Sequence, residues 1–203
     1  TNETSWFSDG SPFKALEKEV FPALEERTSF SCKIWSAACS SGQEPYTISM
    51  LLNEYLSKKA HSYLTSTQIT ATDISTKVIA EAKQGVYEDT IIGRGLSNDR
   101  KQDYFTKVTD GWQVNDVIKR RINFQHQNLL DSFATLGKFD VIFCRNVLIY
   151  FSPELESDIL TRMAKSLIPG GFLFLGASET TQSYSEAFNM IRSASGVYFQ
   201  LKD

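Results

Sequence analysis

The sequence predicts a doubly wound α/β fold, in which a mainly parallel sheet carries helices on both faces. Short apolar runs that suit buried strands alternate with segments whose apolar residues recur at helical spacing. Polar or very small residues follow several of the apolar runs, as expected where parallel strands end at a ligand-binding edge. A polar stretch over residues 86–116 interrupts this alternation and predicts a small insertion.

The apolar periodicity places the individual elements. We predict strands over residues 32–37, 68–72, 122–126, 139–144, 172–176 and 197–201. We predict helices over residues 13–27, 44–58, 76–84 and 153–167. Ser152 suits the N-cap of the last helix and Pro153 its first turn. The run Pro169-Gly170-Gly171 is expected to break this helix before the next strand.

The insertion is predicted to have strands of its own. Residues 105–109 and 112–117 are expected to form a hairpin that turns at Asp110 and Gly111, after a short helix near residues 98–104. The chain then divides into a main domain, residues 1–85 and 118–203, and a small β-subdomain, residues 86–117.

Composition narrows the class of protein. The chain has 203 residues and a net charge of −3, which argues against a general nucleic-acid binder. Three cysteines and two histidines show no zinc-binding spacing, so we expect no metal and a reducing, cytoplasmic setting. No apolar run is long enough to span a membrane, and no signal peptide is recognisable. The chain begins with Thr1 rather than methionine, so we expect it to be a fragment.

The most informative segment is the turn after the first predicted strand. Its residues from Ala38 to Gly42 are very small, and Glu44 and Pro45 follow in the first turn of a helix. Small residues before a helix N-terminus let a cofactor approach the backbone. Glu44 would repel phosphate and attract a cation, which favours S-adenosylmethionine, with its ammonium and sulfonium, over NAD or ATP. The alternative is an ordinary strand–turn–helix crossover.

Two further polar residues follow predicted strands. Asp73 ends the second strand, where a carboxylate can accept hydrogen bonds from both ribose hydroxyls of a nucleoside. Its alternative role is the N-cap of the next helix. Asn128 could offer its amide to an adenine edge, although asparagine at a strand end is more often a turn residue.

The segment after the most apolar strand also carries candidates. Arg145 and Asn146 follow that strand directly, and Tyr150 comes a turn later. The Pro-Pro motif that nucleic-acid amino-methyltransferases usually have here is absent. A tyrosine hydroxyl can orient a substrate group without changing charge near neutral pH. The alternative is that Tyr150 is a core aromatic whose hydroxyl reaches the rim.

Together these segments resemble the CheR family, the chemotaxis receptor methyltransferases that methylate glutamate side chains. The resemblance covers nearly the whole chain and rests above all on Ser-x-Gly-Gln-Glu-Pro-Tyr and Phe-Cys-Arg-Asn-Val-Leu-Ile-Tyr-Phe. It implies a Rossmann-like, class I S-adenosylmethionine-dependent sheet with a small inserted β-subdomain that contacts the receptor. The implied reaction forms glutamate methyl esters on helices of methyl-accepting chemotaxis receptors and yields S-adenosyl-L-homocysteine.

The resemblance also implies roles for particular residues. Tyr150 would be the catalytic residue that faces the transferring methyl. The residues implied in cofactor binding are Asn2 and Thr4 at the methionine end, Ser8, Ala38 in the small-residue turn, Glu44 at the ammonium, Asp73 at the ribose, Asn128 and Leu129 at the adenine, and Arg145 and Asn146.

Two departures from the family pattern shape the expectations. Ser8 stands where the family usually has an arginine, so the alternative function is a cofactor-binding regulatory domain with impaired transfer. The turn around Asp110 is short, so we expect no tether to a receptor tail pentapeptide. We further expect a monomer that neither binds nucleic acid nor inserts into a membrane. A third function, methylation of a small molecule or nucleic acid, is disfavoured by the acidic charge.

Overall fold

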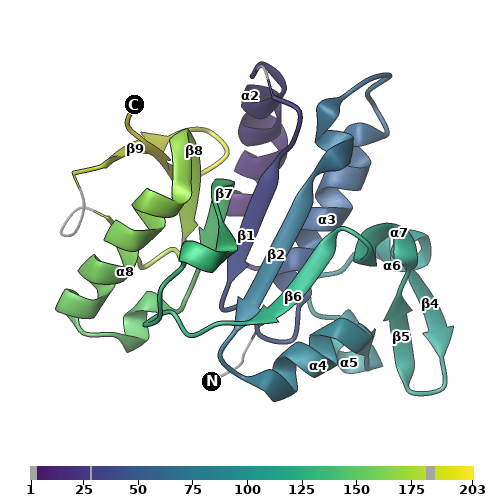
Figure 1. The fold of residues 1–203 in the computed structure, drawn as a ribbon. Coiled ribbons are helices and arrows are strands. Elements are labelled where there is room, and N and C mark those ends of the chain that lie inside the picture. The colour runs from purple at the N-terminus through teal and green to yellow at the C-terminus, as the bar shows by residue number, and fades with distance from the viewer. Residues whose placement is uncertain (1–3, 28, 182–185) are drawn as a thin grey trace.

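The computed structural model describes residues 4–27, 29–181 and 186–203 and confirms the doubly wound α/β fold. Its seven-stranded sheet has the order β6-β2-β1-β7-β8-β10-β9 (Figure 1). The strands from β6 to β8 are parallel, whereas β10 and β9 are antiparallel additions at one edge. A second, three-stranded sheet has the order β3-β5-β4.

The strand bounds agree with the sequence prediction over most of the main sheet. That sheet comprises β1 Lys33–Ala37, β2 Gln68–Asp73, β6 Ile122–His126, β7 Phe139–Cys144, β8 Leu167–Leu175, β9 Phe188–Arg192 and β10 Val197–Leu201. The small sheet comprises β3 Val86–Tyr87, β4 Phe105–Val108 and β5 Gly111–Val114. The helices are α1 Ser11–Ala15, α2 Phe21–Glu25, α3 Gln43–Leu56, α4 Thr76–Gln84, α5 Asp89–Ile92, α6 Asn98–Tyr104, α7 Asp116–Lys119 and α8 Pro153–Ser166.

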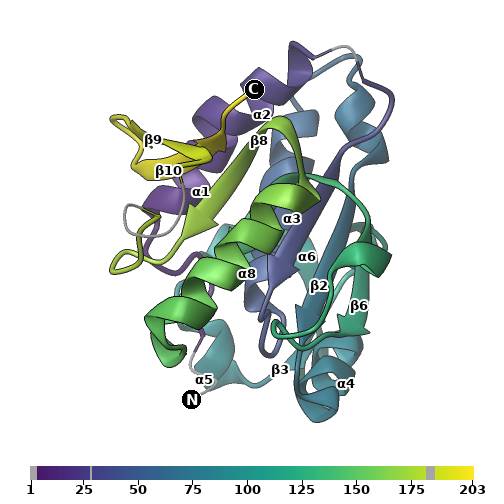
Figure 2. The same cartoon turned by 60° about the vertical axis from the view of Figure 1, so that its left-hand side comes forward.

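Helices cover both faces of the main sheet. Figure 2 shows α8 in front of the sheet, with α1, α2 and α3 behind it. The alternation along β1 explains this arrangement, because successive strand side chains point to opposite faces. Ile34 packs in the cluster of α1, α2 and α3, whereas Trp35 and Ala37 pack in the cluster of α8. The main sheet therefore lies between two apolar cores.

The first predicted helix contains a π-helical segment, Leu16–Val20, between α1 and α2. The amide of Phe21 donates to the carbonyl of Leu16, five residues back. Pro22 follows directly and has no N–H to continue an α-helical pattern. The predicted helix over residues 13–27 is thus confirmed as one region, with an irregularity at its proline.

The strands within the insertion differ from those predicted. The hairpin of β4 and β5 turns at Thr109 and Asp110, and Gly111 pairs with Val108. The predicted strand over residues 112–117 is wrong beyond Val114, because α7 begins at Asp116 with Asn115 as its N-cap residue. Asparagine and aspartate favour helix starts over strand interiors, which accounts for the early end.

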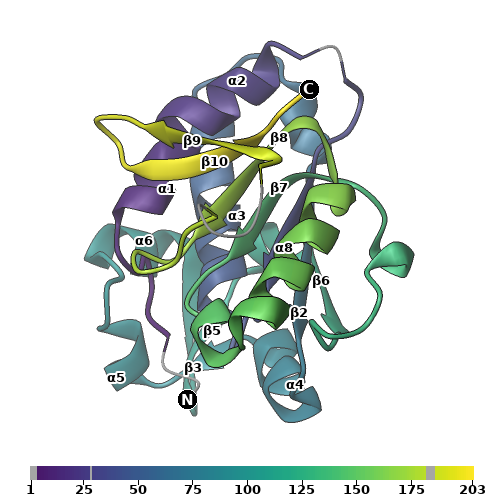
Figure 3. The same cartoon turned by 90° about the vertical axis from the view of Figure 1, so that its left-hand side faces the viewer.

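Strand β8 begins earlier than expected. The predicted break at Pro169 lies inside β8, where residues 168–171 bulge between the Leu167–Phe139 and Phe172–Val141 pairs. Proline lacks a ladder donor but is tolerated at such an irregularity, and Gly170 adopts a φ of 68° there. The sequence prediction also omitted β9, which pairs with β10 at the edge of the sheet (Figure 3).

The N-terminal segment joins the small sheet to the main domain. Trp6 is buried, and its amide donates to the carbonyl of Arg94 at 3.0 Å. Its ring contacts Tyr87 and Phe105 edge-on, with centroid separations of 4.9 and 5.3 Å. The small sheet is therefore held against the chain that leads into the site.

All three cysteines are buried free thiols. Burial raises the pKa of Cys32 to about 12, and it raises the pKa of Cys39 and Cys144 as well.

None of the described helices is long and apolar enough to cross a membrane. Within the same residues, no group of histidine, cysteine and acidic side chains is arranged to hold a metal ion.

A stack of aromatic rings fills the core between the sheet and the N-terminal helix. Phe143 is fully buried, and its ring stacks on Phe174 at 4.5 Å and on Phe13 at 5.8 Å. We expect Phe143→Ala to lower the free energy of unfolding by about 3–5 kcal/mol, because it leaves a cavity in this stack. Phe30→Ala is the matched control, since Phe30 is 93% exposed and should change stability little. Urea unfolding measures the free energy of unfolding of both variants. Equal losses in the two would contradict the packing role of Phe143.

Candidate active site

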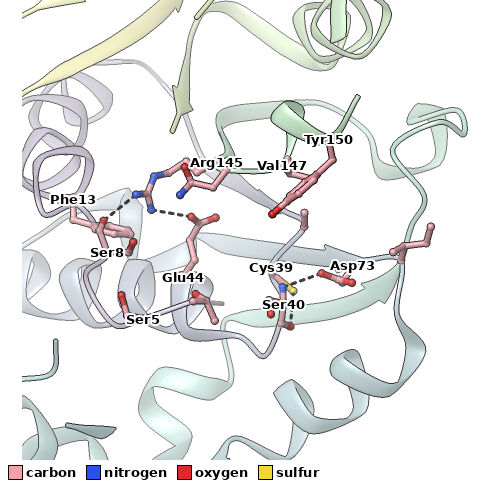
Figure 4. A pocket seen from close by; sticks show the side chains of 14 residues that line it. Ser5, Ser8, Phe13, Cys39, Ser40, Glu44, Asp73, Arg145, Val147 and Tyr150 are labelled. Atoms are coloured by element: carbon pink, nitrogen blue, oxygen red, sulfur yellow. Dashed lines mark hydrogen bonds and ion pairs between the residues drawn. The ribbon is translucent and has the colours of Figure 1, made fainter. Parts of the chain in front are cut away.

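The cavity that holds most of the predicted site residues, called the main cavity below, lies at the carboxyl ends of β1, β2 and β7 (Figure 4). It has a volume of about 230 Å³. The described residues that line it are Thr4, Ser5, Ser8, Phe13, Ala38, Cys39, Ser40, Glu44, Asp73, Ile74, Arg145, Asn146, Val147 and Tyr150. The structure thus brings together most of the residues that the sequence singled out.

The turn of small residues shapes the floor of the cavity. Ala38 and Ser40 adopt positive φ angles of 55° and 49°, and Gly42, before α3, has a φ of 97°. A Cβ on Gly42 would lie 3.1 Å from both Ala82 Cβ and the Tyr87 hydroxyl, so a side chain there would crowd α4 and β3. The small residues thus serve both packing and an open backbone surface.

Asp73 holds this turn against the end of β2. One of its carboxylate oxygens accepts from the Ser40 amide and the other from the Ser75 amide, each at 2.9 Å. The cap of α4 is Ser75, whose hydroxyl accepts from the Val78 amide at 3.3 Å. The alternative that Asp73 caps this helix is therefore wrong, and its carboxylate lines the cavity.

A buried guanidinium joins three segments around the cavity. Arg145 is 3% exposed at its side chain and forms ion pairs with Asp9 at 2.7 Å and Glu44 at 3.2 Å. It also donates to the backbone carbonyl of Ser8 at 2.9 Å. Figure 4 shows Arg145 between Ser8 and Glu44. The sequence placed Arg145 in the site but did not single out Asp9.

Glu44 is an acidic side chain held in a poorly solvated place. Its side chain is 13% exposed and accepts from the Ser36 hydroxyl at 2.8 Å as well as from Arg145. Burial raises the pKa of Glu44, and the positive charge of Arg145 opposes that rise only in part. A cationic group entering the cavity would compensate the remaining cost of the charge.

Glu179 fixes the loop that follows β7. Its two oxygens accept from the backbone amides of Asn146, Val147, Leu148 and Gly176 at 2.7–3.0 Å. A Cβ on Gly176 would lie 2.2 Å from Asn146 Oδ1 and 2.8 Å from Glu179 Oε2, so a side chain there would displace both groups. Sequence reasoning gave Glu179 no role, because its partners are backbone groups distant in the chain.

Tyr150 stands at the mouth of the cavity. It lies in a 3₁₀ turn, Leu148–Tyr150, and is 62% exposed. The alternative that Tyr150 is a core aromatic is therefore wrong. Figure 4 shows its hydroxyl pointing toward the cavity from the side opposite Glu44.

A smaller cavity of about 80 Å³ adjoins the first and shares Ala38, Asp73, Ile74 and Val147 with it. Asn128 and Leu129 also line this smaller cavity. The Oδ1 atom of Asn128 accepts from the Leu130 amide at 3.0 Å, which confirms its turn role.

Of the other residues predicted to bind cofactor, Thr4, Ser8 and Asn146 line the main cavity, whereas Asn2 lies outside the described residues. Sequence reasoning did not single out Ser5, Phe13, Ile74 and Val147, although Ile74 and Val147 each follow a predicted site residue.

Comparison with known proteins agrees with this geometry. The family model described as the SAM-binding domain of CheR methyltransferase matches residues 2–197. Over 203 residues the chain is 49% identical to a chemotaxis protein methyltransferase of Vibrio parahaemolyticus, covering 100% of this chain and 73% of that protein. It is 46% identical to chemotaxis protein methyltransferase 1 of Pseudomonas aeruginosa over 204 residues, covering 74% of the latter.

Solved structures show the same fold at low sequence identity. The magnesium protoporphyrin IX methyltransferase of Synechocystis with bound SAM matches 96% of this chain and 81% of its own, with a TM-score of 0.53 and 14% identity. A TehB-like SAM-dependent methyltransferase of Corynebacterium glutamicum matches 92% of this chain and 86% of its own, with a TM-score of 0.52 and 13% identity. The chain therefore belongs to the CheR methyltransferase family and is a methyltransferase of chemotaxis that uses S-adenosylmethionine.

Proposed function

We propose that the protein forms methyl esters on glutamate side chains in the helical cytoplasmic region of methyl-accepting chemotaxis receptors. The observation that carries this proposal is the set of titratable groups in the cavity. Among the described lining residues these are Cys39, Glu44, Asp73, Arg145 and Tyr150, with no histidine or lysine. A hydroxyl or amine acceptor usually needs a base, whereas a glutamate is already ionised near neutral pH.

The thiol and the two carboxylates of this lining are not suited to act as that base. The pKa of Cys39 is raised by burial, so its thiol stays protonated. Glu44 pairs with Arg145, and both oxygens of Asp73 accept from backbone amides. A carboxylate acceptor is therefore the substrate class that this cavity fits best.

The cavity also fits S-adenosylmethionine. Its ammonium would compensate Glu44, whose charge is held in a largely buried position. The hydroxyl of Ser40 is buried without a hydrogen-bond partner among the described residues, beside Asp73, and both suit a ribose. When bound, this cofactor supplies a methyl group already activated by a positive sulfur. The protein's own task is then to orient the acceptor and exclude water.

We assign the remaining roles by position. Asn128 and Leu129 would border the adenine in the smaller cavity. Thr4, Ser8, Ala38, Arg145 and Asn146 would border the methionine end and the mouth, and Tyr150 would face the methyl group. Asn2 stays a prediction outside the described residues.

The alternative of an impaired regulatory domain rests on Ser8 and gains no support from the structure. Arg145 Nη2 lies 2.9 Å from the Ser8 carbonyl oxygen, so a guanidinium already lies next to position 8.

The inserted residues 86–117 are proposed to contact the receptor beside the main domain. The hairpin of β4 and β5 turns within two residues, Thr109 and Asp110, which supports docking without a tail-pentapeptide tether.

The direct test of the function uses purified protein, tritiated S-adenosylmethionine and a cytoplasmic receptor fragment. We expect label on the receptor that alkali releases as methanol, because carboxylate esters hydrolyse in base. Receptor fragments with glutamine at the labelled positions serve as the control and should stay unlabelled. Label that resists alkali, or label on RNA or a metabolite instead, would refute the proposal.

Glu44→Gln should weaken cofactor binding and change how the stability of the fold depends on pH. Loss of a charge-assisted contact, about 1.5–3 kcal/mol, should lower affinity for S-adenosylmethionine about tenfold or more in calorimetric titration. Because the pKa of Glu44 is raised in the folded state, its stabilising effect is present at low pH and lost as pH rises through that pKa. Glutamine stays neutral, so the stability of the variant should fall less than that of wild type as the pH rises above the ordinary pKa of glutamate.

Glu154→Gln is the matched control for Glu44→Gln, because Glu154 is an exposed acid in the first turn of α8, as Glu44 is in α3. The control should change neither affinity nor the slope of stability against pH. A Glu44→Gln variant with wild-type affinity would remove Glu44 from the cofactor site.

Tyr150→Phe removes one hydroxyl at the mouth of the cavity. We expect turnover to fall about tenfold or more while affinity for S-adenosylmethionine changes less than about twofold, because the hydroxyl acts on the acceptor. Tyr63→Phe removes a hydroxyl that does not line the cavity and should leave turnover unchanged. If Tyr150→Phe instead abolished cofactor binding at normal stability, Tyr150 would belong to the donor site.

A further inference from the structure

A second and larger cavity lies on the other side of the loop after β7. It has a volume of about 430 Å³ and opens between the end of β8, the start of α1 and the turn between β9 and β10. Its apolar lining includes Pro12, Met190 and Phe199, and its polar lining includes Asp9, Glu179 and Arg192. The reaction assigned above uses none of this space.

The two cavities are divided by a thin wall of residues already described. Asp9 lines the second cavity and pairs with Arg145, which lines the first. Glu179 lines the second cavity and accepts from the amides of Asn146 and Val147, which line the first. A peptide segment seated in the second cavity would therefore lie directly beside the methyl donor.

The acidic groups of the second cavity are already compensated. Asp9 has its guanidinium partner at 2.7 Å, and Glu179 accepts from four backbone amides. Neither carboxylate therefore needs a cation from a ligand. Compensated carboxylates also repel an incoming anion less than free ones do.

Arg192 is the uncompensated charge of this cavity. It ends β9, is exposed, and forms no ion pair with any residue in the described parts of the chain. A guanidinium is suited to bind a carboxylate through two parallel hydrogen bonds. The cavity thus combines an apolar floor with one available cation, which matches an acidic peptide segment.

We propose that the second cavity seats the substrate segment next to the acceptor glutamate, and that Arg192 positions it by pairing with an acidic side chain. The inference rests on the proposed function, since it takes the substrate to be an acidic region of a protein. Arg192 would also supply a cation for the substrate in a chain that has serine at position 8, where the family usually has an arginine. Arg192 is a positioning residue in this scheme and does not touch the reacting atoms.

The test compares Arg192→Glu with Lys202→Glu, a matched reversal of an exposed charge at the opposite end of the same hairpin. Initial rates of alkali-labile methylation are measured on the receptor fragment at several fragment concentrations and at two salt concentrations. We expect Arg192→Glu to raise KM for the fragment about tenfold or more, because it brings like charges together. Its kcat and its affinity for S-adenosylmethionine should match wild type. Arg192→Lys should restore most of the loss, and salt should raise KM in wild type more than in Arg192→Glu.

The outcomes separate this inference from the proposed function. If wild type forms ester and Arg192→Glu has a KM within about twofold of it, the inference fails and the function stands. Equal effects of Arg192→Glu and Lys202→Glu would show a general charge effect and also overturn it. Loss of cofactor affinity in Arg192→Glu would mean a structural role, contrary to the proposal. If wild type forms no ester on receptor fragments, both proposals fail together.

Discussion

The geometry of the site depends on one buried guanidinium. Arg145 extends from the end of β7 and holds the N-terminal segment at Ser8 and Asp9 against Glu44 at the start of α3. These segments are distant in the chain, and Arg145 contacts all of them at once. A buried charge with two carboxylates and a carbonyl tolerates few geometries, because a lost partner leaves an unpaired ion in a poorly solvated place. The contacts of Arg145 with Asp9, Glu44 and the Ser8 carbonyl therefore fix the position of this wall of the cavity.

Two carboxylates organise backbone rather than substrate. Asp73 joins the small-residue turn to the end of β2, and Glu179 fixes the loop after β7. Each satisfies amides that would otherwise lie unpaired at the carboxyl edge of the sheet. An edge of this kind can stay open to a ligand because these backbone amides are paired before the ligand arrives.

The sequence predicted the parts of the fold that follow from periodicity. The bounds of the buried strands β1 and β7 were predicted within one residue, because short apolar runs of this kind are typical of strands buried on both faces of a sheet. Strand β9 was missed because its residues alternate weakly. Strand β8 was predicted too short because the run Pro169-Gly170-Gly171 was assigned to the break after the preceding helix. The candidate site was largely predictable because its residues follow strands. Asp9 and Glu179 were not singled out, since only tertiary contacts across the chain give them partners.

The three buried thiols offer a built-in measure of local unfolding in this protein. Reagents that alkylate cysteine react with an accessible thiolate, and burial denies these side chains both access and ionisation. Cys32 precedes β1, Cys39 lies in the turn beneath the cavity and Cys144 ends β7. Labelling each position would therefore time the local unfolding of a different part of the sheet, with no probe added to the chain.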